Sequence, residues 1–162
     1  MARATPTPRP LRIIIDGPTG SGKTTFASQL ARELGALVLH SDDWVPGWNG
    51  FERGTKVTED LVSGARDSYT RFDWETYQNG EEVCPDATRD WVVEGSGSLT
   101  RETRAHADIT IWVETDPKKA KARALARDGE DFAPWWDTWK TQERQHESQN
   151  SPRDLADFIV TT

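Results

Sequence analysis

Lys23 and Thr24 close a glycine-rich segment whose residue types suit the binding of a polyphosphate. The segment follows three β-branched apolar residues and matches G-x-x-x-x-G-K-T. Glycines let consecutive N–H groups point inward as a nest for anions, lysine adds a mobile positive charge, and a threonine hydroxyl is a ligand that Mg²⁺ accepts. The pattern predicts that nucleotide phosphates bind here; the alternative is an ordinary strand-to-helix turn. The residues are Gly17, Pro18, Thr19, Gly20, Ser21, Gly22, Lys23, Thr24 and Thr25.

The elements around this segment, residues 17–25, which we call the phosphate loop, fit a phosphate site. Residues 11–15 read as a buried strand, and residues 24–35 as an amphipathic helix that ends at Gly35. Helix N-terminal N–H groups and the helix dipole favour an anion at this point.

Strand and helix patterns alternate along the rest of the chain. Alternation of this kind predicts an α/β fold, with a five-stranded parallel sheet covered by helices on both faces. Residues 41–55 read as a loop, and the polar stretch 59–77 as helical. The other strands are expected at 36–40, 90–97, 108–114 and 155–160, and the other helices at 99–107, 116–131 and 133–149.

Three acidic residues directly follow predicted strands. Asp42 and Asp43 come after the second strand, and Glu94 follows the three apolar residues of the third and precedes Gly95. Because ligands of parallel sheets bind beyond the carboxyl ends of the strands, we expect these side chains and the phosphate loop to meet in one crevice.

Composition narrows the classes of partner. The chain has 162 residues and a net charge of −7, which favours one domain over residues 11–162 and argues against non-specific binding to nucleic acid or membranes. Residues 1–10 read as a flexible leader, and no apolar run approaches the length of a membrane span. Cys84 is the only cysteine, so an intramolecular disulfide is impossible, which suits a cytoplasmic protein.

Several phosphate-loop classes are poor matches. The sequence contains neither the D-x-x-G nor the N-K-x-D motif of regulatory GTPases. It is short for motor or AAA-type ATPases and lacks a long apolar strand that ends in Asp-Glu. Small phosphoryl-transfer kinases remain.

The order of short motifs resembles the uridine kinase and nicotinamide riboside kinase group of small-molecule kinases. After the phosphate loop come "HSDDW", "RFDWETY", "VVEGSGSL", "ADITIWVETDPKKAKARALARDGED" and "LADFIV", over residues 11–160. The resemblance implies a P-loop NTPase fold of the nucleoside and nucleotide kinase type with a lid, ATP and Mg²⁺ as cofactors, and transfer of a phosphoryl group to a hydroxyl.

The resemblance also implies roles for single residues. It places the proton acceptor on Asp42, with Asp43 as the alternative, and aligns Asp73 with an aspartate that contacts substrate hydroxyls. Trp44 stands where the group commonly has phenylalanine, in the substrate loop. Asp42 and Asp43 could instead cap a turn, and Asp73 could cap a helix.

Glu94, Arg123 and Arg127 have residue types suited to phosphoryl transfer. Glu94 could hold Mg²⁺ together with Thr24 or orient the substrate, because Gly95 permits close approach of the backbone. The two arginines are four residues apart on one helix face and could close over the phosphates as a lid. The alternatives are a surface carboxylate and a solvated basic helix.

Aromatic residues and histidines are numerous enough to need an interpretation. Trp44 and Trp48 could form a wall that stacks on a flat ring, or could simply pack. The helical spacing of Trp135, Trp136 and Trp139 indicates core positions. His40, His106 and His146 show no metal-binding spacing and read as structural or surface residues.

We therefore predict an ATP- and Mg²⁺-dependent phosphotransferase whose acceptor is the hydroxyl of a small, nucleoside-like metabolite. Lys23, Arg123 and Arg127 would offset the charge of the transferred group. The alternatives are an antibiotic phosphotransferase, a non-catalytic ATP-binding module, and a nucleoside monophosphate kinase. The last would need arginines for the acceptor phosphate, and the candidates are Arg53, Arg71, Arg101 and Arg104.

Overall fold

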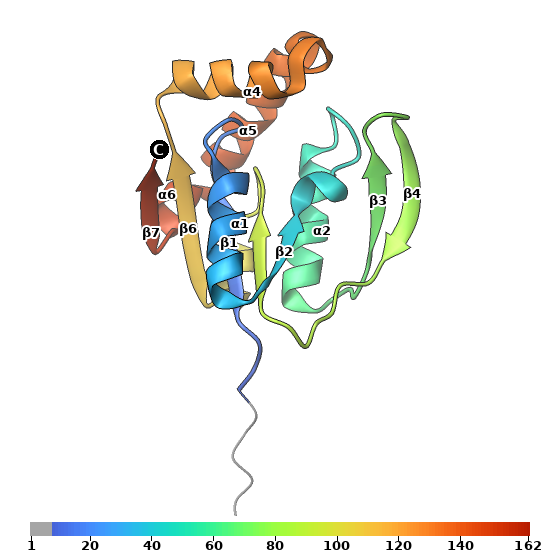
Figure 1. The fold of residues 1–162 in the computed structure, drawn as a ribbon, viewed down its shortest axis with the longest axis vertical. Coiled ribbons are helices and arrows are strands. Elements are labelled where there is room, and N and C mark those ends of the chain that lie inside the picture. Colours follow the sequence, from blue (N-terminus) through green and yellow to red (C-terminus); the bar gives the residue numbers. More distant parts are fainter. Residues whose placement is uncertain (1–7) are drawn as a thin grey trace, which may run out of the picture.

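The computed structural model describes residues 8–162, and Figure 1 shows its ribbon. Most of the predicted leader, residues 1–7, lies outside the described residues. The predicted five-stranded parallel sheet is confirmed, with the strand order β2-β5-β1-β6-β7. Its strands are β1 (Arg12–Asp16), β2 (Leu37–His40), β5 (Trp91–Glu94), β6 (Ile109–Glu114) and β7 (Phe158–Thr161).

The central strand β1 is apolar on both sides because both faces of the sheet are covered. Ile13 and Ile15 pack on one face with Ala27 of the first helix. Ile14 points to the opposite face, into a cluster that includes Leu61. This double coverage explains why the strand reads as a continuous apolar run.

The helices end and begin largely where the sequence indicates. Gly35 caps the first helix in a left-handed conformation, with φ of 65°. Asp116 caps another, accepting hydrogen bonds from the N–H groups of Lys118 and Lys119. The helices are α1 (Lys23–Leu34), α2 (Phe51–Ser63), α3 (Arg101–His106), α4 (Pro117–Phe132), α5 (Trp136–Asn150) and α6 (Pro152–Leu155), with short 3₁₀ turns at Ser41–Asp43 and Ala133–Trp135.

The helices α4 and α5 close the carboxyl end of the sheet. In Figure 1, α4 runs across the tips of the strands, above the loop that joins β1 to α1. Within residues 8–162, no helix combines the length and the apolar character needed to cross a membrane.

The predictions for residues 41–55 and 59–77 are wrong in part. Helix α2 begins inside the predicted loop, and an antiparallel hairpin, β3 (Tyr69–Asp73) and β4 (Gln78–Val83), replaces the end of the predicted helix. Glycine disfavours helix interiors, yet Gly54 lies inside α2 because any Cβ there would collide with the side chain of Val45. Packing between distant segments, rather than local preference, decides this region.

Candidate active site

The phosphate loop is held in a tight curl by backbone and side-chain contacts. Gly20 and Gly22 adopt φ of 80° and 94°, a left-handed region that favours glycine. A Cβ on Gly20 would collide with the carbonyl oxygen of Ala120 in α4. The Lys23 Nζ donates to the carbonyl oxygen of Pro18 at 2.9 Å, so the ammonium lies within the curl of the loop.

A buried carboxylate behind the loop joins it to its neighbours. Asp16 accepts hydrogen bonds from the N–H groups of Gly17, Gly97 and Leu99 at 2.6, 3.1 and 3.0 Å. His146 of α5 lies 2.9 Å from the same carboxylate through Nε2. Burial is the largest single influence and lowers the pKa of His146, but the hydrogen bond to Asp16 and the charges of Asp16 and two nearby glutamates together outweigh it, so the net shift is upward. Sequence analysis missed this link because its two residues are 130 positions apart.

A second buried carboxylate, Glu143 of α5, contacts the phosphate loop directly. Its Oε1 accepts from the backbone N–H of Thr19 at 2.8 Å and from the Trp139 indole at 3.1 Å. Its Oε2 accepts from Lys140 Nζ at 2.6 Å. Helix α5 therefore sets the position of the loop, and nothing in the local sequence signals this role.

Glu94 lies at the centre of the site. It is 2% exposed, and its Oε1 accepts from the Thr24 hydroxyl at 3.1 Å and lies 2.6 Å from His40 Nδ1. The hydrogen bond to Glu94 raises the pKa of His40 more than burial lowers it. His40 was predicted to be structural or at the surface, whereas the structure brings it into this cluster.

Two adjoining pockets open over these residues. The larger, of about 800 Å³, has six aromatic side chains in its lining, and we call it the aromatic pocket. The smaller, of about 530 Å³, is lined by the phosphate loop, and we call it the loop-side pocket. Their shared wall consists of Lys23, Thr24, Asp42, Glu94, Arg127 and Asp128. The two pockets thus meet at the residues suited to phosphoryl transfer.

Asp42 lies in this wall, in the 3₁₀ turn that follows β2. Its side chain is open to the cleft and solvent reaches it, but protein atoms around it displace part of its water. That desolvation and the repulsion from Glu94 raise the pKa of Asp42, while Lys23 and Arg127 oppose the shift. The Trp74 indole N–H donates to the Asp42 backbone carbonyl at 2.9 Å and fixes the turn.

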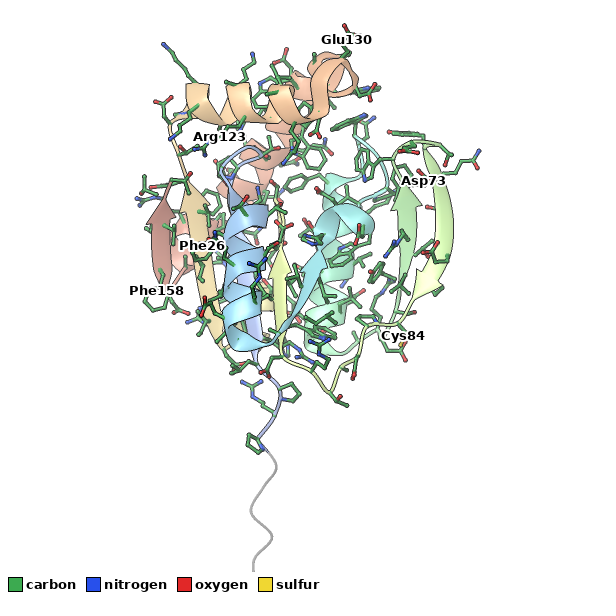
Figure 2. All side chains as sticks on the ribbon, in the orientation of Figure 1. Phe26, Asp73, Cys84, Arg123, Glu130 and Phe158 are labelled. Atoms are coloured by element: carbon green, nitrogen blue, oxygen red, sulfur yellow. The ribbon has the colours of Figure 1, made fainter. Side chains whose placement is uncertain are left out.

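The two candidate lid arginines occupy different places. Arg127 lines both pockets and pairs with Asp128, with Nη2 to Oδ2 at 2.9 Å. The hydrogen bond to Asp128 raises the pKa of Arg127. Arg123 lines neither pocket and donates a hydrogen bond to the Thr162 hydroxyl at 3.0 Å. Figure 2 labels its position beside the phosphate loop.

The structure places the three residues predicted to contact substrate in different surroundings. Trp44 is 3% exposed and packs on Tyr69 in the core, with its indole N–H bonded to Thr58, so the predicted substrate contact is wrong. Asp73 accepts from the N–H groups of Glu75 and Thr76, caps the hairpin turn (Figure 2) and lies outside the lining of both pockets. Asp43 lines only the loop-side pocket.

Most of the aromatic pocket was not predicted. Trp48 was a candidate, and the structure brings it into the pocket, where it packs edge-on against Trp74. Trp135 was expected in the core but is 38% exposed and lines the pocket. The arginines proposed for an acceptor phosphate, Arg53, Arg71, Arg101 and Arg104, do not line it. Its aromatic members are Trp48, Trp74, Tyr77, Phe132, Trp135 and Trp139.

A family model described as an AAA domain matches residues 13–152. The chain belongs to this family. The match lies within the 162 residues of the chain, so length does not separate the chain from this family. It agrees with the phosphate loop and with the sheet order described above.

Curated relatives of this AAA-domain chain are kinases. The cytidylate kinase of Archaeoglobus fulgidus is 30% identical over 124 residues, which cover 75% of this chain and 64% of that protein, so the match spans less than two thirds of the relative. The shikimate kinase of Corynebacterium diphtheriae is 28% identical and covers 95% of this chain and 86% of that protein. These relatives support an ATP-dependent phosphotransferase that acts on a small molecule, and they do not specify the substrate.

Solved structures confirm the fold class of this AAA-domain chain. A possible uridine kinase from Bacillus stearothermophilus aligns with a TM-score of 0.60 at 23% identity, over 97% of this chain and 91% of that one. A putative fructose transport system kinase from Silicibacter gives 0.66 at 21% identity, over 97% and 92%. The shikimate kinase of Acinetobacter baumannii, solved with shikimate, gives 0.55 at 19% identity, over 94% and 84%. The P-loop kinase fold predicted from the sequence is therefore confirmed, consistent with the uridine kinase resemblance.

Proposed function

We propose that residues 11–162 form one kinase domain that uses ATP and Mg²⁺ to phosphorylate a hydroxyl of a small molecule. One observation carries the proposal: the loop-side pocket and the aromatic pocket share a wall that contains Lys23, Asp42, Glu94 and Arg127. A nucleotide whose phosphates rest on the phosphate loop would point its terminal phosphate at an acceptor in the aromatic pocket.

Asp42 is the proposed general base. The acceptor oxygen attacks the terminal phosphorus, the bond to the bridging oxygen of ADP breaks, and the hydroxyl proton passes to Asp42. The upward shift in its pKa makes the ionised Asp42 carboxylate a stronger proton acceptor. Asp43, the alternative base, lines only the loop-side pocket, which supports Asp42.

Lys23 and Arg127 are the proposed source of positive charge in the transition state. Lys23 would leave the Pro18 carbonyl and bind the transferred group, since a lysine side chain is long and flexible. Arg127 would exchange part of its bond to Asp128 for phosphate oxygens. The Arg123 side chain would have to leave Thr162 before it could contact phosphate. We therefore assign Arg123 a lesser role as a lid residue.

Thr24 and Glu94 are the proposed protein ligands of Mg²⁺. Mg²⁺ accepts hard oxygen ligands and commonly takes only one or two from protein beside phosphate oxygens and water. The Thr24 hydroxyl and the buried Glu94 carboxylate meet at 3.1 Å, so the residues present fit the ion. When bound, Mg²⁺ would neutralise charge on the nucleotide phosphates.

The aromatic pocket supports an acceptor with a flat or apolar body, as a nucleoside has. Its volume suits a small molecule, and its walls offer ring faces and edges for stacking. A nucleoside monophosphate is a weaker candidate because the four arginines suggested for its phosphate lie away from the pocket.

The test is a mass-spectrometric screen in which protein, ATP and Mg²⁺ meet a pooled library of nucleosides, nucleotides, vitamins and aminoglycosides. We expect one compound to gain a phosphoryl group. Asp42→Asn should keep ATP affinity and lose about 10²- to 10⁴-fold in transfer rate, whereas the matched control Asp43→Asn should lose far less. Unchanged transfer in Asp42→Asn would refute the assignment of the base, and ATP binding without any product would favour the non-catalytic module.

A further inference from the structure

The aromatic pocket carries unpaired negative charge at its mouth. Glu75 comes from the turn between β3 and β4, and Asp131 comes from the last turn of α4. The two carboxylates therefore reach the pocket from separate elements, the β3–β4 hairpin and helix α4. In the described part of the chain, neither takes part in an ion pair.

Positive charge in this pocket is confined to the wall shared with the loop-side pocket. Lys23 and Arg127 are the only basic side chains that line the aromatic pocket, and Arg127 is already paired with Asp128. The lining includes five acidic side chains against these two basic ones. The surface left for the body of an acceptor is thus aromatic and acidic.

Ring faces and carboxylates both attract cations. An ammonium over an indole face gains energy from the ring quadrupole, and the gain grows where water is displaced. Trp74 and Tyr77 flank Glu75 along the hairpin turn, and Trp135 follows Asp131 by one helical turn. An anionic acceptor would meet repulsion from the carboxylates, with no free arginine to offset it.

We propose that the acceptor is a cationic alcohol, with the hydroxyl at Asp42 and an ammonium or similar cation between Glu75 and Asp131. This inference rests on the proposed function, because it identifies the acceptor class of the same site. It narrows the acceptor by charge and excludes anionic alcohols such as hydroxy acids and monophosphates as preferred substrates.

The test uses three probes of one shape that differ in charge. They are 4-(hydroxymethyl)benzylamine, 4-methylbenzyl alcohol and 4-(hydroxymethyl)benzoate. Binding is followed by quenching of tryptophan fluorescence in the presence of Mg²⁺ and a non-hydrolysable ATP analogue. We expect the amine to bind roughly tenfold more tightly than the neutral alcohol, and the carboxylate most weakly. Added salt should reduce this preference.

Variants that remove charges test whether Glu75 and Asp131, rather than other surface charges, cause the preference for the amine. Glu75→Gln together with Asp131→Asn should bring the amine close to the affinity of the neutral alcohol. Glu130→Gln and Glu81→Gln are matched controls and should leave the preference unchanged, since neither lines the pocket. Figure 2 shows Glu130 on the outer side of the α4 segment, pointing away from the sheet.

Equal binding of the amine and the neutral alcohol, or no quenching by the amine, overturns the proposal. A preference that survives in the double variant overturns it as well, because the charge would then come from elsewhere. These readouts need no phosphoryl transfer, so a charge preference without any phosphorylated product would count against the proposed kinase activity while leaving the binding of cations established.

Discussion

Replacement of Glu143 should loosen the phosphate loop from helix α5. In Glu143→Ala, the backbone N–H of Thr19 and the indole N–H of Trp139 both lose their acceptor in a buried environment. An unsatisfied buried donor costs about 1–3 kcal/mol. Lys140 is partly exposed and can turn to water, so loss of its ion pair with Glu143 adds less to the cost.

Two orphaned donors together give a cost of about 2–6 kcal/mol in the free energy of unfolding, and we expect a value near 4. Glu143→Gln keeps an acceptor oxygen for Thr19 and Trp139 but loses the charge and the acceptor for the partly exposed Lys140, so about 1 kcal/mol is expected. The measurement is urea denaturation followed by tryptophan fluorescence. Asp137→Asn, an exposed acid on the same helix, is the control and should change the free energy of unfolding by less than about 1 kcal/mol.

Nucleotide affinity gives a second readout for the same variants. If Glu143 orders the loop before the nucleotide arrives, Glu143→Ala should bind an ATP analogue more weakly, because the loop must then be ordered on binding. The reasoning is refuted if Glu143→Ala unfolds within about 1 kcal/mol of the parent chain, or if it binds nucleotide as tightly as Glu143→Gln does.

Three further predictions concern the loop, the buried histidine and the aromatic pocket. Gly20→Ala should unfold at lower temperature and bind nucleotide poorly, because a Cβ there meets the Ala120 carbonyl and φ is positive; normal thermal unfolding would contradict this. The pKa of His146 is raised above 6.5 by Asp16, so its stabilising contribution should be complete below pH 6.5 and lost as pH rises through the raised pKa. Thermal unfolding across pH should show this loss, and His146→Gln should flatten it. Trp135→Ala should raise the acceptor KM about three- to tenfold with unchanged nucleotide affinity in steady-state assays, and an unchanged acceptor KM would remove Trp135 from the site.

Local patterns were sufficient for the phosphate loop and the sheet. The run Ile13–Ile14–Ile15 is buried on both faces of the sheet. A continuous run of β-branched apolar residues is typical of a central parallel strand, so the residue types alone predict it. Gly35 and Asp116 mark helix ends through local hydrogen bonds. Because alternation predicts a parallel sheet and ligands gather at the carboxyl ends of its strands, the sequence also predicted that Asp42 and Glu94 lie near the phosphate loop.

Tertiary packing decided what surrounds that centre. Trp44 and Trp48 are four residues apart in one loop, yet the first packs in the core on Tyr69 and the second lines the pocket. Asp73 had the right type for a substrate contact, but its Oδ1 accepts two backbone hydrogen bonds in the hairpin turn. No spacing in the sequence distinguishes these outcomes, because each depends on a partner brought in from another element.

The sequence by itself thus determined the phosphate loop, the parallel sheet and the carboxylates at its edge, since each depends on local residue types and chain order. The structure alone decided that Glu143 and His146 of α5 hold the loop, through contacts that span more than 120 residues. It also decided that the hairpin and the end of α4 enclose one pocket with aromatic and acidic walls. Long-range hydrogen bonds and side-chain packing arise only once the chain is folded, and they shape the acceptor side of the site.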